Sequence, residues 1–84
     1  MVLNDLFATI KARKTANINE SWTMKLLSEG PEKCAEKFGE EAIEAIIEAV
    51  KGDKKALTLE AADVLYHLLV MLAAADVELN DVML

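Results

Sequence analysis

The sequence predicts an all-α protein, a small antiparallel bundle of four to five helices in one domain spanning residues 1–84. Apolar residues recur at the three- and four-residue spacing of a helix face, without the strict alternation that marks strands. Hydrophobic residues make up 54% of the chain but aromatic residues only 5%, so the apolar material is mostly Ala, Leu, Val, Ile and Met. A chain of this size hides only about 60% of its unfolded surface. We therefore expect either a homo-oligomer or an exposed apolar face.

The first part of the chain predicts two helices joined by a polar loop. Helical spacing of apolar residues predicts a first helix from Val2 to about Lys14, and its apolar face comprises Leu3, Leu6, Phe7 and Ile10. Residues 15–20 are polar and Asn-rich, which is typical of a loop. Ser21 is expected to cap a short helix over Trp22–Glu29, which Gly30 ends.

A long third helix is predicted from Pro31, a residue suited to a first helical turn, to about Lys51. Its expected apolar face comprises Cys34, Phe38, Ala42, Ala45, Ile46 and Ala49. Gly39 lies inside this helix, where glycine costs up to ~1 kcal/mol relative to alanine. A close backbone approach or a bend is therefore expected at Gly39.

A fourth helix is predicted from Lys54 to about Ala75, after Gly52-Asp53 interrupts the pattern. Its second half is apolar almost all round, which indicates a helix enclosed by partners. Residues 76–78 are expected to form a turn, and residues 79–84 the start of a final helix.

Charge and composition exclude several classes of function. Nine basic against 15 acidic residues give a net charge of −6, which disfavours general nucleic-acid binding and attraction to anionic membranes. The longest apolar stretch, Val64–Ala75, has about twelve residues, fewer than the ~20 that span a bilayer. One cysteine excludes an internal disulfide framework and a Cys-based zinc cluster. With no signal-peptide pattern at the N-terminus, a soluble cytoplasmic protein is expected.

Acidic side chains follow one face of each long helix. At ~100° per residue, the third helix places four charged side chains in a stripe about 60° wide, with Glu40 at its border. The members of this stripe are Lys37, Glu41, Glu44 and Glu48. In the fourth helix, Glu60, Asp63 and His67 share a stripe of similar width.

The turn near Gly52 sets which of these residues face one another. Glu44 and Glu60 lie eight residues on either side of Gly52, and Glu41 and Asp63 lie eleven. A short connection produces an antiparallel hairpin, in which residues equidistant from the turn sit at the same height. If the two stripes face each other, the four carboxylates form two facing rungs.

Four carboxylates this close together require a cation or raise one another's pKa. Oxygen-only ligands suit Mg²⁺ or Mn²⁺, and Mg²⁺ is commonly shared between carboxylates and substrate phosphates. Lys37, at the rim, is placed to hold a phosphate oxygen. The alternative is an ordinary solvated acidic face, but Glu60 and Asp63 interrupt an otherwise apolar helix, where unpaired charges are costly. His67 is expected to be a core histidine or one that supports a ligand.

Three blocks of sequence resemble the phosphoribosyl-ATP pyrophosphohydrolase family of histidine biosynthesis. They are Ser-Trp-Thr-Met-Lys-Leu-Leu at 21–27 with Gly30 after it, Lys-Phe-Gly-Glu-Glu-Ala-Ile-Glu at 37–44, and Glu-Ala-Ala-Asp-Val-Leu-Tyr-His-Leu-Leu-Val at 60–70. The pair of motifs Glu-x-x-Glu at 41–44 and Glu-x-x-Asp at 60–63 also resembles the motif pair of the wider MazG-like all-α nucleotide pyrophosphohydrolases. The resemblance covers about residues 3–82, and the three blocks in order make it specific.

This resemblance implies Mg²⁺-dependent hydrolysis of phosphoribosyl-ATP at its α–β phosphoanhydride, by an α-helical homodimer. It implies that Glu41, Glu44, Glu60 and Asp63 bind the metal. Glu40 would orient or deprotonate water, and Lys37 would contact phosphate. Weaker candidates for substrate contacts are Arg13, Ser21, Thr23 and Lys25.

Two other functions stay open at this point. A related MazG-like enzyme acting on dUTP or non-standard nucleotides would use the same carboxylates, although the Ser-Trp-Thr and Tyr66-His67 segments favour the first assignment. A non-catalytic helical interaction module would need no metal. The family commonly continues with the rest of the last helix and a short basic tail, so contacts made by such a tail are expected to be absent from these 84 residues.

Overall fold

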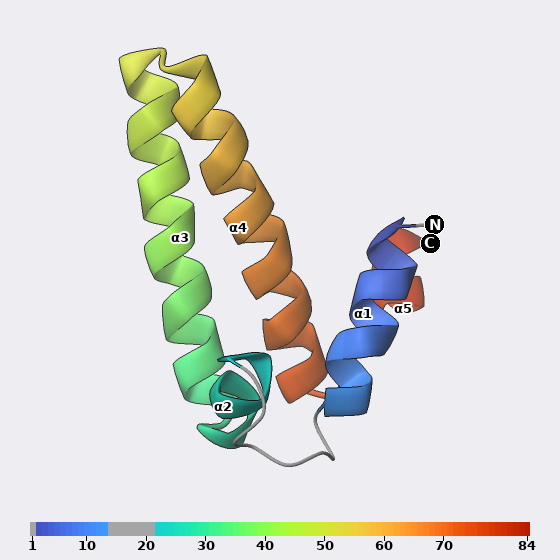
Figure 1. Ribbon diagram of the computed structural model, residues 1–84. Coiled ribbons are helices and arrows are strands. Elements are labelled where there is room, and N and C mark those ends of the chain that lie inside the picture. The colour runs from blue at the N-terminus through green and yellow to red at the C-terminus, as the bar shows by residue number, and fades with distance from the viewer. Residues whose placement is uncertain (1, 14–21) are drawn as a thin grey trace.

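Five helices form the part of the chain that the computed structural model describes, residues 2–13 and 22–84 (Figure 1). They are α1 (Val2–Arg13), α2 (Trp22–Ser28), α3 (Pro31–Lys51), α4 (Lys54–Ala74) and α5 (Leu79–Met83). These two segments contain no strand, so the predicted all-α class is confirmed. The predicted loop at 15–20 and the expected cap at Ser21 lie outside the described residues.

The two long helices, α3 and α4, form an antiparallel hairpin with a tight turn at its tip (Figure 1). Gly52 ends α3 with φ of 77°, a left-handed conformation that glycine adopts without steric cost. Asp53 then caps α4, because its side chain accepts a hydrogen bond of 3.0 Å from the backbone N–H of Ala56. Two adjacent residues thus reverse the chain and fix the register of the hairpin.

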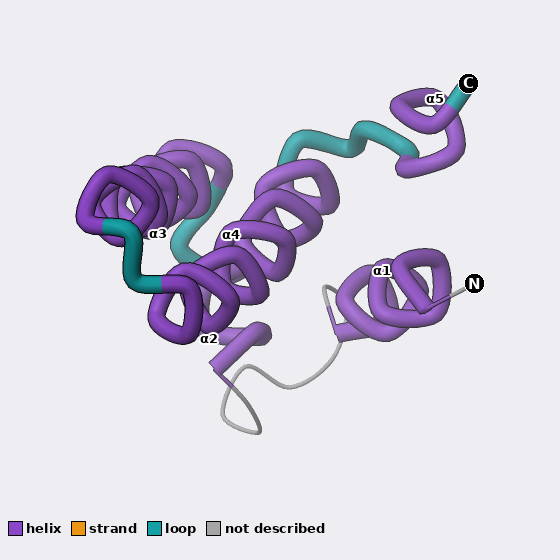
Figure 2. Tube along the Cα trace, turned by 90° about the horizontal axis from the view of Figure 1, so that it is seen from above, coloured by secondary structure: helices purple, strands orange, loops and turns teal. Residues whose placement is uncertain are grey.

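The hydrophobic core gathers around the C-terminal half of α4, which lies between α3 on one side and α1 on the other (Figure 2). Its buried members are Phe7, Ile10, Leu26, Cys34, Leu69, Val70, Ala73 and Leu79. By length and composition alone, α4 would also pass as a membrane span, a weak criterion that core helices meet as well. Since three of these buried side chains come from α4, it serves here as the core helix.

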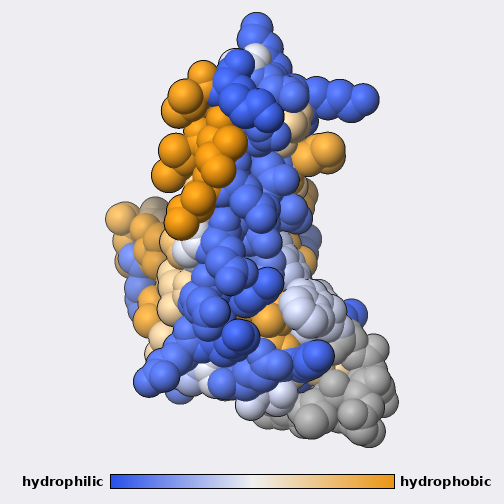
Figure 3. Space-filling view, turned by 90° about the vertical axis from the view of Figure 1, so that its left-hand side faces the viewer, coloured by the Kyte–Doolittle hydropathy of each residue, from blue (hydrophilic) through white to orange (hydrophobic). Residues whose placement is uncertain are grey.

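The other half of the hairpin, toward its tip, leaves large apolar side chains uncovered. They are Ile43, Ile46, Ile47, Val50, Leu59 and Leu65, with exposed fractions from 45% to 82%. Figure 3 shows apolar surface over this part of the molecule. We call these six residues the apolar tip face. An exposed apolar face was one of the two outcomes expected from composition.

Two expectations for α3 differ from the structure. Ile46 and Ala49, assigned to the apolar face with Cys34, are exposed, because no third helix within residues 2–13 and 22–84 covers the half of the hairpin nearest its tip. A Cβ added at Gly39 would meet nothing within 4 Å, so none of the described residues makes a close approach there, and the other expectation, a bend, stays a prediction.

Candidate active site

The hairpin brings together carboxylates from its two helices. Glu41 of α3 and Glu60 and Asp63 of α4 each offer an oxygen, and these oxygens lie within 4.8 Å of one another. Glu41 and Glu60 are partly buried, and Asp63 is exposed. Glu41 and Asp63 were predicted to share a height, and the structure places both in this cluster.

Glu44, the fourth predicted ligand, lies beside the other three acids and, like Asp63, is exposed, whereas Glu41 and Glu60 are partly buried. By hydrogen bonding and by its charge it raises the pKa of both Glu41 and Glu60. Glu44 therefore acts electrostatically on an acid of each helix, but it is not one of the three residues whose oxygens lie within 4.8 Å of one another. We call Glu41, Glu44, Glu60 and Asp63 the acidic cluster.

The electrostatics of the cluster show an unbalanced negative charge. Burial is the largest cause of the raised pKa of Glu41, followed by the charges of Glu44 and Asp63. Burial also leads for Glu60, followed by its hydrogen bond with Glu44 and the charges of its neighbours. Oε2 of Glu60 is buried without a hydrogen-bond partner among the described residues. A hard divalent cation would satisfy this oxygen and neutralise the carboxylates, so the donor set can hold a metal.

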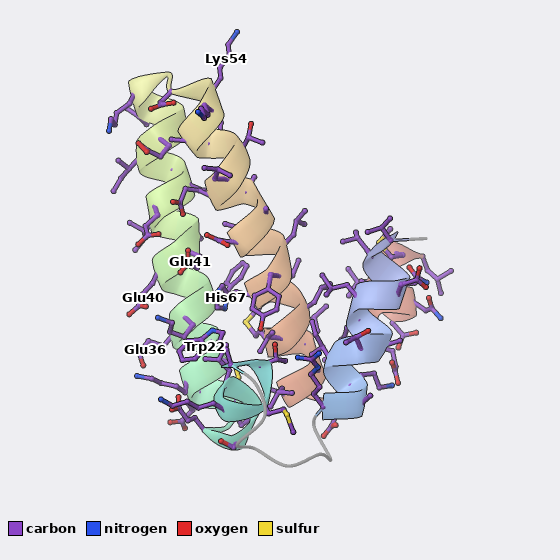
Figure 4. The ribbon with its side chains drawn as sticks, viewed as in Figure 1. Trp22, Glu36, Glu40, Glu41, Lys54 and His67 are labelled. Atoms are coloured by element: carbon purple, nitrogen blue, oxygen red, sulfur yellow. The ribbon has the colours of Figure 1, made fainter. Side chains whose placement is uncertain are left out.

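Lys37 and Glu40 form an ion pair at the rim of the cluster. Lys37 Nζ lies 3.1 Å from Oε2 of Glu40, and this hydrogen bond is the main cause of the raised pKa of Lys37. The Lys37 charge in turn works against the rise in the pKa of Glu41. Glu40, whose side chain is 50% exposed, lies outside the group of three carboxylates (Figure 4). Lys37 is therefore a cation within electrostatic reach of the cluster, as predicted.

His67 lies next to the cluster on the α4 side, one turn beyond Asp63. It is only 6% exposed, and its Nε2 is 3.9 Å from Oε1 of Glu41 (Figure 4). Burial is the main cause of its lowered pKa, and the charge of Lys37 lowers the pKa further. The charges of Asp63 and Glu40 act in the opposite direction, so burial is what sets the direction of the shift in the pKa of His67.

The structure does not bring the described weaker substrate candidates, Arg13, Thr23 and Lys25, into the acidic cluster. Thr23 is buried, and its hydroxyl is hydrogen-bonded to the hydroxyl of Tyr66, which gives it a structural role. Lys25 lies over the half-exposed ring of Trp22, 5.6 Å from the centroid. Arg13 ends α1, which lies across α4 from α3. Ser21 lies outside the described residues.

A shallow pocket of about 260 Å³ adjoins the cluster toward the hairpin tip, and sequence reasoning did not identify it. It is lined by Glu44, Ile47, Glu48, Lys51 and Glu60. The side chain of Glu48 is only 18% exposed and pairs with Lys51 at 3.1 Å. The position of Glu48, four residues after Glu44, was the available signal, but spacing alone does not show how far each acid is buried.

Comparison with known proteins gives consistent matches. Residues 3–84 match the family described as phosphoribosyl-ATP pyrophosphohydrolase. The chain is 76% identical over 83 residues to the phosphoribosyl-ATP pyrophosphatase of Roseobacter denitrificans, covering 99% of this chain and 79% of that protein. It is 72% identical over 82 residues to the protein of the same name from Ruegeria pomeroyi, covering 98% and 78%. With that from Jannaschia sp. the identity is 74% over 80 residues, covering 95% and 78%.

Proposed function

Because the chain belongs to the phosphoribosyl-ATP pyrophosphohydrolase family, we propose that residues 1–84 form one catalytic domain that works through the acidic cluster of α3 and α4. The protein is a phosphoribosyl-ATP pyrophosphatase, an enzyme of histidine biosynthesis, as its close relatives are. In the reaction we propose, water adds across the α–β phosphoanhydride of phosphoribosyl-ATP and releases phosphoribosyl-AMP and pyrophosphate.

The observation that carries this proposal is the convergence of three carboxylate oxygens within 4.8 Å. An all-oxygen donor set with a buried, unpartnered oxygen on Glu60 fits Mg²⁺, with Mn²⁺ as a substitute. Glu41, Glu60 and Asp63 would hold the ion, with Glu44 as the fourth ligand. When bound, the ion would neutralise phosphate charge and polarise the phosphorus under attack.

The residues at the rim would bind the substrate and move a proton. Lys37 would donate a hydrogen bond to a phosphate oxygen in place of its present partner, Glu40. Glu40 would then be free to accept the proton of the attacking water. The water oxygen forms the new bond to phosphorus, and the bridging oxygen leaves with pyrophosphate. Arg13, Ser21, Thr23 and Lys25 stay proposed substrate contacts, although the Thr23 hydroxyl is already engaged.

We also propose that the enzyme is a cytoplasmic homodimer, in which the apolar tip face of one copy packs on that of the other. Six large apolar side chains that are 45% to 82% exposed would not persist on a monomer without cost. They lie on the hairpin that carries the acidic cluster, so the dimer contact would also hold the site's scaffold rigid.

The catalytic proposal is tested by measuring pyrophosphate release from phosphoribosyl-ATP by the purified protein. With Mg²⁺, turnover is expected, and it should stop in excess EDTA. Asp63→Asn should lower kcat about 100- to 1,000-fold, as loss of a group that stabilises the transition state does. Glu36→Gln, which alters an exposed acid of the same hairpin, is the matched control and should leave kcat unchanged.

The proposal would be overturned by the absence of pyrophosphate release with either Mg²⁺ or Mn²⁺. Equal turnover of dUTP in the same assay would favour the related nucleotide pyrophosphohydrolases instead. Unchanged turnover in Asp63→Asn would remove the acidic cluster from the mechanism.

A further inference from the structure

His67 is a buried polar side chain that the proposed reaction does not use. Only 6% of the residue is exposed, and its Nε2 lies 3.9 Å from the Glu41 carboxylate, with the charged groups of Lys37, Glu40 and Asp63 also acting on the ring. We propose that His67 is a positioning residue, whose ring donates its Nε2–H to Oε1 of Glu41 and leaves the other oxygen of Glu41 for the divalent ion. This inference rests on the proposed metal site.

The surroundings of the two ring nitrogens determine which one carries the proton. Nε2 lies 3.9 Å from Oε1 of Glu41, whereas Nδ1 is buried without a hydrogen-bond partner among the described residues. An ionised carboxylate only accepts hydrogen bonds, so the ring can bond to it only through a protonated Nε2. A shift of about 1 Å would bring the pair within hydrogen-bonding distance, and such contacts often tighten only when the complex forms.

A second contact to the His67 ring comes from Tyr66, its neighbour along the chain. The rings of Tyr66 and His67 meet edge to face, with centroids 5.0 Å apart and planes at 78°. Tyr66 is itself fixed by the hydrogen bond between its hydroxyl and that of buried Thr23. A chain of contacts thus runs from α2 through α4 to Glu41 on α3.

Support of this kind has a measurable effect on metal affinity. Ligating carboxylates are themselves hydrogen-bonded in metal sites, and loss of such a partner typically weakens metal binding about 10- to 100-fold. Without the donor, Glu41 would sample orientations that take it away from Glu60 and Asp63. His67 would therefore set the affinity of the site for the ion.

The test measures Mn²⁺ affinity of the full chain by electron paramagnetic resonance, for wild type and three variants. His67→Leu removes the donor and keeps an apolar side chain. His67→Gln keeps an N–H donor near the position of Nε2. Met71→Ala, one turn along α4 and partly buried, is the control for a loss of packing alone.

His67→Leu is expected to raise the Kd for Mn²⁺ about 10- to 100-fold, and His67→Gln to restore most of the affinity. Met71→Ala should lower the Tm and leave the Kd unchanged. Wild-type affinity in His67→Leu, or equal weakening in His67→Leu and His67→Gln, would overturn the positioning role while the metal site stands. A wild-type protein that binds no Mn²⁺ would overturn the metal site and this inference together.

A second measurement applies if His67→Leu does not fold. The ¹⁵N chemical shifts of the wild-type imidazole identify its tautomer directly. The proposal expects the proton on Nε2 and a shift of the Nε2 resonance when Mg²⁺ is added. A proton on Nδ1 in the Mg²⁺-saturated protein would overturn it.

Discussion

At the scale of single residues, the site is a set of like charges that folding forces together. Burial and mutual repulsion raise the pKa of Glu41 and Glu60, and the charge of Lys37 offsets only part of this for Glu41. The protein thus gives up stability in the metal-free state to keep these carboxylates in place. A cation that binds the folded state alone would return that stability.

The pH dependence of stability follows from these raised pKa values. The folded protein binds protons at Glu41 and Glu60 more tightly than the unfolded chain, whose glutamates titrate near 4.5. The stability that this contributes is fully present below pH 4.5 and is lost as the pH rises through the raised values. Glu60→Gln removes one of the repelling charges and should raise the Tm of the metal-free protein by several degrees at pH 7 but not at pH 4.

Thermal melts of both proteins in EDTA at the two pH values check this expectation. Glu36→Gln serves as the control, because Glu36 lies on the same hairpin, is exposed and pairs with Lys33. A lower Tm for Glu60→Gln than for wild type at pH 7 would contradict the repulsion argument.

The sequence predicted the composition of the site better than its geometry. Equal distances from Gly52 correctly put Glu41 beside Asp63, because the turn is tight and both helices are regular. Spacing could not show that Glu44 stays more exposed than Glu41, since both fall in one stripe about 60° wide. Nor could it show that Glu40 is held by Lys37, a contact that depends on rotamers.

At the scale of elements, the hairpin is the part that sequence predicted most fully. Its two helices begin at the predicted residues, and α4 ends within one residue of its prediction. Pro31, Gly52 and Asp53 account for this, because each has a strong and local backbone preference. Burial along α3 was predicted less well, since it depends on which neighbours the helix meets.

The capping bond of Asp53 gives a prediction for this element. Asp53→Ala removes the acceptor for the N–H of Ala56 and should cost about 1 kcal/mol of unfolding free energy. For a domain of this size, that corresponds to a fall in Tm of about 4–8 °C. Asp53→Asn keeps an oxygen acceptor and should lose much less. Equal losses in the two variants, measured by urea and thermal unfolding, would show that the cap is not the cause.

At the scale of the whole molecule, the hydrophobic core and the apolar tip face occupy different parts of the fold. The core surrounds the C-terminal half of α4, while the apolar tip face stays uncovered at the other end of the hairpin (Figure 3). Composition predicted surplus apolar surface but not its location, because location depends on where α1, α2 and α5 pack. Gly39, where an added Cβ would meet nothing within 4 Å, is also a residue of α3.

The proposed dimer makes a prediction at this scale. Val50→Glu places a charge in the apolar tip face, where 82% of Val50 is exposed in the single chain, and should convert a dimer to a monomer. Val2→Glu is the matched control, since Val2 is 80% exposed but lies on α1. Light scattering during size-exclusion chromatography measures both masses. A monomeric wild type, or a Val50→Glu protein that stays dimeric, would contradict this interface.

The central claim is that α3 and α4 present their acidic side chains to one shared metal position. Anomalous diffraction from crystals grown with Mn²⁺ tests it most directly, because it locates the ion without assuming its ligands. We predict one strong peak within about 2.2 Å of carboxylate oxygens from Glu41, Glu60 and Asp63, a normal distance for these small cations. A peak bound by acids of one helix only, or no peak between the two helices, would contradict the account.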